Sequence, residues 1–204
     1  MKKTILTWSL AAAVLLASTA DAYQTIKGCQ LKRKTSCQGV NLSGENLTKS
    51  NLAGADLANA NLSGANLSAD RITEANLTNA NLANANLADA DLSETYMTNA
   101  NLSRANLAKA NLSQSSLPGA NLTEANLAGA NLSITNFKGA NLTGANARGA
   151  GFVMSSLVNA NLTRVDFTEA TLVGADLRNA ILLDAKFCKT TMPDRSINNS
   201  GCPK

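Results

Sequence analysis

Ala60-Asn61-Leu62-Ser63-Gly64 is one copy of a five-residue unit that fills most of this 204-residue chain. In every copy from Leu42 to Met192 the third position holds a large apolar side chain, with Ala147 as the exception. A small residue, usually Ala, stands two positions before it, and Asn or Asp usually stands directly before it. Because this frame never shifts, the fold must accommodate a period of five residues.

That period fits neither a continuous α-helix nor a straight β-strand. In a helix, successive leucines would be offset by about 140° around the axis and would form no apolar stripe. In a straight strand, an odd period would send successive leucines to opposite faces. Every leucine stays on one side only if the chain turns by about 90° after each unit, so that four units close a square. The period therefore predicts a solenoid of about 20 residues per coil, with the leucine and the small residue inside.

The tandem Ala-(Asn/Asp)-Leu-x-x units resemble the pentapeptide-repeat proteins over about three-quarters of the chain. This resemblance implies an all-β fold, a right-handed quadrilateral parallel β-helix of about 7–8 coils. The handedness rests on the resemblance alone, because the period does not determine it. The segment from Thr191 to Cys202 also resembles the closing segment of exported cyanobacterial members, in which a Gly is common where Arg195 stands.

The first 22 residues have the pattern of a secretory signal peptide. Lys2-Lys3 precede an apolar run, and Ala20-Asp21-Ala22 matches an A-x-A cleavage site. The run is shorter than a membrane span, and an uncleaved anchor is the alternative. Caps are expected beyond the repeats, because a solenoid leaves open strand edges at both ends. The predicted segments are a signal peptide (1–22), an N-terminal cap (23–39), the β-helix (40–192) and a C-terminal cap (193–204).

The four cysteines form one pair at each end of the repeats. Some eight coils at ~4.8 Å per coil place the ends on the order of 37 Å apart, whereas a disulfide needs Cα atoms within ~7 Å. The reachable pairs are therefore Cys29–Cys37 and Cys188–Cys202, as fits an exported protein. A shared zinc ion is disfavoured, because the pairs are far apart and the chain has no His.

Charge is distributed unevenly along the chain, although the net charge is only +4. Residues 23–39 hold four bases and no acid. Residues 40–103 hold seven acids and two bases, a balance of −5, and residues 104–193 hold five acids and eight bases, a balance of +3. We therefore expect a rod that is electrically polarised along its axis.

Departures from the repeat identify the candidate functional residues. One group of outward positions on adjoining coils is apolar, whereas elsewhere they are mostly Asn, Ser, Thr, Gly, Ala or charged. Contiguous exposed apolar residues suggest a contact surface, and coverage by the chain's own C-terminal tail is the alternative. This apolar patch consists of Ile134, Val153, Met154, Val158 and Val173.

Other departures have structural explanations. Phe137, Phe152 and Phe167 are expected to fill the space that Ala147 leaves. Inward hydroxyl groups recur in consecutive coils and are expected to donate to nearby carbonyls. Glu45 and Asp70 also fall at inward positions, where we expect them to accept backbone N–H bonds or to mark a bulge. The four stacked hydroxyl residues are Thr95, Ser115, Thr135 and Ser155.

No catalytic, metal-binding or cofactor-binding residues are predicted. Without His there is no Ser-His or Cys-His pair for nucleophilic catalysis. No Gly-rich phosphate-binding loop joins a strand to a helix. We therefore do not expect an enzyme, and we expect no cofactor.

The best-supported prediction is a non-enzymatic structural or protein-interaction scaffold, exported to the periplasm or thylakoid lumen or secreted. Its partner is expected to be a protein, and neither nucleic acid nor, once the signal is cleaved, a membrane. One alternative is that the regular Asn/Ser/Thr face, which follows the column from Leu42 to Leu182, binds ice or polysaccharide. A second alternative, suggested by relatives that imitate DNA and act on gyrase, is that this protein also interacts with DNA gyrase. That function needs a dimeric, strongly acidic cytoplasmic rod, whereas this mature chain is basic.

Overall fold

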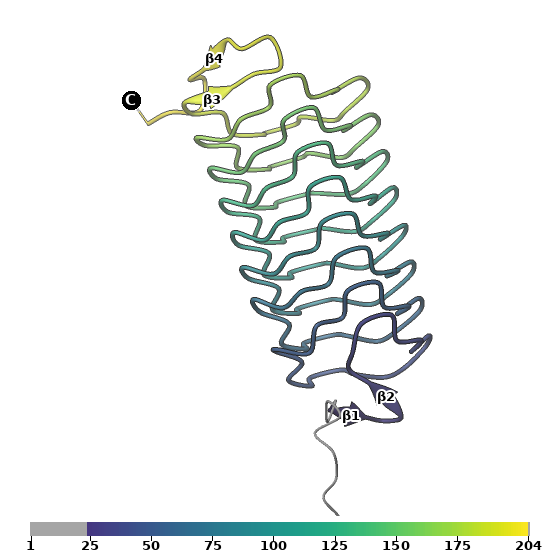
Figure 1. Ribbon diagram of the computed structural model, residues 1–204. Helices are drawn as coiled ribbons and strands as arrows, with labels where there is room; N and C mark the ends of the chain where they lie inside the picture. The colour runs from purple at the N-terminus through teal and green to yellow at the C-terminus, as the bar shows by residue number, and fades with distance from the viewer. Residues whose placement is uncertain (1–23, 204) are drawn as a thin grey trace, which may run out of the picture.

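The computed structural model describes residues 24–203, and the predicted signal peptide lies outside these residues. Within this range the chain forms a stack of four-sided coils that rises from the N-terminal to the C-terminal end (Figure 1). No helix occurs among the described residues. The regular strands are two short hairpins, one at each end, and the coils between them are joined by single β-bridges.

Each coil takes 20 residues. Asn41 pairs in parallel with Asn61, and Asn61 with Asn81. The same offset separates the partners of every bridge, from Ser36↔Asp56 to Thr171↔Thr191. The residue directly before the core position makes the bridge in every unit except that of Asn51, which confirms the predicted coil length and the parallel stacking.

The turn after each unit explains why Asn recurs before the leucine. The Asn61 Oδ1 accepts the backbone N–H of Ser63 at 3.2 Å, and the Ala65 N–H donates to the Leu62 carbonyl at 3.0 Å. Gly64, which lies between Ser63 and Ala65, has a φ of 66°, in the left-handed region that Gly and Asn tolerate best. The Asn side chain thus satisfies a backbone N–H group of the turn.

The interior is a closed column of Leu and Ala. Leu62, Leu102 and Leu142 are fully buried, as are the alanines two positions before them. Where Ala147 replaces the leucine, aromatic rings take the space: the Phe152 ring centroid lies 6.0 Å from that of Phe137 and 5.6 Å from that of Phe167. The predicted repacking is confirmed, and Phe187 extends it by stacking on Phe167 at 5.5 Å.

The buried hydroxyl groups form the predicted ladder. Thr95 and Ser115 both donate to the Leu92 carbonyl at 2.7 Å. Thr135 donates to the Leu112 carbonyl at 2.8 Å, and Ser155 donates to the Phe152 carbonyl at 2.9 Å. All four residues are at least 98% buried. These hydroxyls are thus consumed inside the fold, and those of Ser115 and Thr135 link adjacent coils.

The two inward carboxylates behave differently. Asp70 is buried, and its Oδ1 accepts the backbone N–H groups of Asn51 at 3.0 Å and Arg71 at 2.8 Å, as predicted. It also accepts from the Ser50 hydroxyl. The prediction for Glu45 was wrong: this residue is half-buried and pairs with Lys27 at 3.1 Å. It lies in the first coil, where the side chain can reach past the end of the stack.

Each end carries an antiparallel hairpin next to a disulfide. At the N-terminal end, β1 (Thr25–Ile26) pairs with β2 (Cys29–Gln30). At the C-terminal end, β3 (Thr190–Thr191) pairs with β4 (Ile197–Asn198) through a turn in which Arg195 has a φ of 70°. Both predicted disulfides form: the Cα atoms are 5.5 Å apart in Cys29–Cys37 and 4.6 Å apart in Cys188–Cys202.

Candidate interaction surface

The fold brings four of the five predicted patch residues together at one corner of the rod. Val153 and Met154 belong to one coil, which lies between the coil that carries Ile134 and the coil that carries Val173. The Ile134 N–H donates to the Val153 carbonyl at 2.8 Å, and the Met154 N–H donates to the Val173 carbonyl at 2.9 Å. Val158 lies one unit further along the coil, on the adjoining face. Four residues of the apolar patch, Ile134, Val153, Met154 and Val173, are therefore contiguous at one corner.

The patch is open to solvent. Met154 is 67% exposed and Ile134 is 56% exposed, whereas the three valines are half-buried. The chain continues the column only as far as Pro193, whose carbonyl accepts the Gly174 N–H at 3.0 Å. It then folds back over β3. The C-terminal tail therefore leaves Ile134 and Met154 uncovered.

A glycine makes room for Met154. Gly174 lies directly above it in the next coil, and a Cβ built on Gly174 would lie 3.4 Å from the Met154 Cγ. The Met154 side chain thus extends over the bare backbone of the next coil. A flexible, polarizable thioether in such a position can adapt to an irregular partner surface.

The same corner changes character along the rod. The corner ridge consists of one residue per coil, each with a positive φ: Glu74, Glu94, Gln114, Ile134 and Met154. Its two carboxylates are exposed and make no ion pair within residues 24–203. Tyr96, 58% exposed, lies two residues beyond Glu94. An acidic section with one exposed aromatic ring is therefore followed by an apolar section.

Sequence reasoning identified the apolar section of the ridge but not its acidic continuation. The signal was present, because positions that differ by 20 occupy the same corner in successive coils. Following that column from Met154 back to Glu74 joins the two sections.

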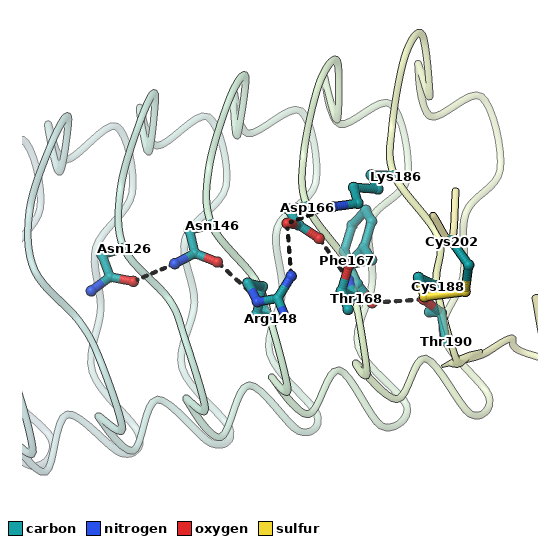
Figure 2. A network of polar contacts seen from close by, with 10 residues as sticks. All are labelled: Asn126, Asn146, Arg148, Asp166, Phe167, Thr168, Lys186, Cys188, Thr190 and Cys202. Atoms are coloured by element: carbon teal, nitrogen blue, oxygen red, sulfur yellow. Dashed lines mark hydrogen bonds and ion pairs between the residues drawn. A yellow bond between two sulfur atoms is a disulfide. The ribbon is translucent and has the colours of Figure 1, made fainter. Parts of the chain in front are cut away.

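A cluster of polar side chains surrounds Asp166 on another face of the rod (Figure 2). Its carboxylate accepts the Thr168 backbone N–H at 2.9 Å and pairs with Arg148 at 3.3 Å and Lys186 at 3.7 Å. Burial opposes ionisation, but the contacts with Thr168, the Arg148 hydrogen bond and the Lys186 charge outweigh it and hold the pKa of Asp166 below its usual value. This cluster ties three coils together.

The Asn/Ser/Thr face is largely occupied with internal bonds. Four Asn amides of this face donate to the Asn of the previous coil, as Asn61 does to Asn41 at 3.2 Å and Asn81 does to Asn61 at 3.3 Å. The same oxygen also accepts a turn N–H, as Asn61 does from Ser63. The polar lattice is real, but its amide groups stabilise the coil. Binding of ice or polysaccharide stays an untested prediction.

The described part of the chain contains no group of three His, Cys, Asp or Glu side chains placed to hold a metal ion. None of its segments is a helix of the length and apolarity needed to cross a membrane.

Sequence comparison agrees with the geometry. The family described as "Pentapeptide repeats" matches in eight copies, over residues 33–68, 75–114, 105–144, 120–153 and 155–192. The chain belongs to the pentapeptide repeat family. Proteins of this family form right-handed quadrilateral β-helices and are generally non-enzymatic structural or interaction proteins. No curated protein matches the chain significantly.

Solved structures give the same result at the level of the fold. QnrB1, a plasmid-mediated fluoroquinolone resistance protein, superposes with a TM-score of 0.61 at 19% identity, over 83% of this chain and 80% of that one. At this identity the likeness shows the shared fold alone. HetL, from the cyanobacterium Nostoc and involved in heterocyst differentiation regulation, is 28% identical over 81% of this chain and 92% of its own, with a TM-score of 0.31.

A pentapeptide repeat protein of the Arabidopsis thaliana thylakoid lumen is 30% identical over 58% of this chain and 67% of its own, with a TM-score of 0.24.

Proposed function

We propose that this protein is an exported, non-enzymatic scaffold of about 7–8 coils that binds another protein through the corner ridge and the apolar patch beside it. The observation that carries the proposal is the exposure of Ile134 and Met154 next to Val153 and Val173. The corresponding outward positions of most other coils hold polar, charged or small residues. A contiguous apolar surface on a soluble rod is typical of a contact site.

The ridge also indicates the chemistry of the partner. A protein segment that lies along it would meet Glu74 and Glu94 at one end and Ile134 and Met154 at the other. Complementarity therefore favours a segment with basic residues followed by apolar ones. The apolar end would supply most of the affinity, whereas the exposed carboxylates would speed association in a salt-dependent manner.

Export is supported by the signal-peptide pattern and by the two disulfides. Both disulfides staple a hairpin at an end of the rod, and such bonds persist in oxidising compartments. The periplasm, the thylakoid lumen and the cell exterior all satisfy this condition. Fractionating cells and sequencing the N-terminus of the protein tests both export and cleavage near residue 22.

The binding proposal is tested by quantitative pull-down from the protein's own compartment. Val153→Ser and Met154→Ser together are expected to remove the specific partners. The matched control is Thr123→Ser and Glu124→Gln, which changes the corresponding positions on another face. Equal recovery of every partner by both variants, with unchanged melting temperatures, would show that the patch is not the contact site.

A further inference from the structure

The backbone N–H groups along the corner ridge are already paired between coils. The Ile134 N–H donates to the Val153 carbonyl at 2.8 Å, and the Met154 N–H donates to the Val173 carbonyl at 2.9 Å. Every other ridge residue donates its N–H to the next coil in the same way. The ridge therefore offers no row of free N–H groups with which a partner strand could pair. A partner segment that docks there must satisfy its own backbone, as an α-helix does.

The spacing of the ridge also suits a helix. Successive coils are ~4.8 Å apart, and one turn of an α-helix rises ~5.4 Å. A helix that lies along the rod therefore brings one side chain to each ridge residue, from positions three or four residues apart in its sequence. Side chains on one face of an extended strand recur about every 6.6–6.8 Å, so they do not match the coils.

Glycines bound the ridge at both ends. In the same column, Gly54 lies one coil before Glu74, and Gly174 lies one coil after Met154. Between these glycines the ridge spans four coil steps, or about 19 Å. A helix of about 13–15 residues covers this length. Its contacts would fall at roughly positions 1, 4, 7 or 8, 11 and 14 of the bound segment.

The two sides of the ridge differ in height. On the face that carries Val153, the positions next to the ridge in the lower coils are half-buried serines: Ser93, Ser113 and Ser133. On the other side of the ridge, the Tyr96 side chain is 58% exposed. A helix can therefore approach the backbone closely on the Val153 side, whereas the tyrosine ring stands in its way on the other.

Gly151, in the next column of the Val153 face, departs from the repeat although the fold does not require a glycine there. In the coil below, Asn131 donates to Asn111 at 3.0 Å and accepts the Ser133 N–H at 3.2 Å. Glycine can make neither bond. Its φ lies outside the left-handed region. Beyond its chain neighbours, a Cβ built on Gly151 would meet only the Thr171 Cγ2 among residues 24–203, at 3.9 Å. The missing side chain thus leaves a hollow between Asn131 and Thr171.

We infer that the partner segment is an amphipathic α-helix that lies along the rod axis on the corner ridge and packs over Gly151. The helix adds a conformation, a length and a register to the binding proposed above, on which this inference rests. Basic side chains of the helix would lie against Glu74 and Glu94, and apolar ones against Ile134 and Met154, one turn apart. An apolar side chain at the second end of the helix would fill the hollow at Gly151.

Cross-linking with mass spectrometry at residue level tests the conformation of the bound segment. The photoreactive amino acid p-benzoylphenylalanine replaces Glu74 in one variant of the full, exported chain and Met154 in another. On a helical partner, the two captured residues are expected to lie about 13 positions apart in the partner's sequence. On an extended segment they would lie about six positions apart.

The outcomes separate this inference from the proposed function. Capture of one segment at a separation of about six residues, or of segments distant in sequence, would overturn the helix but keep the corner ridge as a contact site. If neither position captures a specific protein, the binding proposal fails together with the helix.

Restoring the repeat at Gly151 tests the position of the helix. Gly151→Asn continues the column of Asn111 and Asn131, so the melting temperature is expected to be kept or raised. Because the new side chain fills the hollow, recovery of the partner is expected to fall at least about fivefold. The control is Gly64→Asn at the opposite corner, where a Cβ would meet nothing within 4 Å, and its recovery should not change.

Undiminished recovery by Gly151→Asn, or equal losses in both variants, would overturn the placement of the helix over Gly151. If Gly151→Asn lowers the melting temperature, Gly151→Ala replaces it. That variant adds one methyl group to space that the fold leaves open, and it is expected to weaken recovery in the same direction by a smaller factor.

Discussion

At the scale of single residues, the repeat determines where a side chain lies. Departures from the repeat determine which of the inward side chains make hydrogen bonds. The same inward position holds Ala in most coils, a hydroxyl in four stacked coils and the buried carboxylate of Asp70 in another. Each polar substitution is matched by a backbone partner: Thr135 donates to the Leu112 carbonyl, and Asp70 accepts from Asn51. Burial without such partners would be costly.

Restoring the repeat at Ala147 is expected to destabilise the protein. Ala147 is fully buried beside Phe152 and Phe167, which occupy the space of the missing leucine. Ala147→Leu should therefore overpack the core and lower the free energy of unfolding by about 1–3 kcal/mol. Urea denaturation measures this free energy. The reference variant is Leu127→Ala, which is expected to cost about 2–5 kcal/mol because it leaves a cavity. A more stable Ala147→Leu protein would mean that the rings do not fill the site.

At the scale of elements, polar clusters hold neighbouring coils in register. Asp166 accepts from Thr168 in its own coil and pairs with Arg148 in the coil below and Lys186 in the coil above. The pKa of this carboxyl is held below its ordinary value, so the folded state binds its proton more weakly than the unfolded state does. Its contribution to stability is therefore complete above the unfolded pKa of about 3.9 and is lost as the pH falls through the folded pKa.

Replacing Asp166 with Asn should remove this pH dependence. Asn keeps the Oδ1 that accepts the Thr168 N–H and continues the column of Asn146, but it loses both ion pairs. We expect a loss at pH 7 within about 1 kcal/mol, and a difference from the native protein that shrinks as the pH falls below about 4. Melting temperatures across pH measure it, with the exposed Asp89→Asn as control. A difference that does not change with pH would contradict the assignment.

Removing the Cys188–Cys202 disulfide is expected to release the tail without unfolding the rod. This bond closes a loop with a sequence separation of 14 residues, worth about 3 kcal/mol in the chain-entropy model. In a Cys188→Ala, Cys202→Ala protein, hydrogen exchange should increase over residues 186–203 and remain slow over the central coils. Uniform loss of protection along the rod would show instead that the tail supports the whole solenoid.

At the scale of the whole molecule, one coil is the unit that can be removed. Deleting residues 101–120 joins Ala100 to Asn121 and keeps every later residue in its column. That protein is expected to fold with a cooperative melting transition. Deleting Ser103 alone shifts the frame of the units that follow it, so that their leucines leave the core. Circular dichroism melting compares the two, and equal stability of both deletions would contradict the period of five.

The period allowed the coil, its contents and both disulfides to be predicted from the sequence, because equivalent positions recur every 20 residues. Local departures at the ends were harder. Glu45 was assigned to the interior, but in the first coil its side chain reaches Lys27 of β1. The incomplete burial of Leu177 and Leu182 in the last coil was also not predicted, because the path of residues 193–203 depends on Cys202 and on no repeat. The apolar patch was found, but its connection to Glu74 and Glu94 needed the corner geometry.

Site-specific photo-cross-linking in the protein's own compartment tests the proposed contact most directly. A photoreactive amino acid at Met154, on the corner ridge, is compared with one at Asn84, an exposed corner of another face. We expect position 154 to capture a specific protein, through a segment with basic and apolar residues, and position 84 not to capture it. High salt should reduce that product, as should Glu94→Gln. If positions 154 and 84 capture the same proteins, or neither captures any, the corner ridge is not the binding surface.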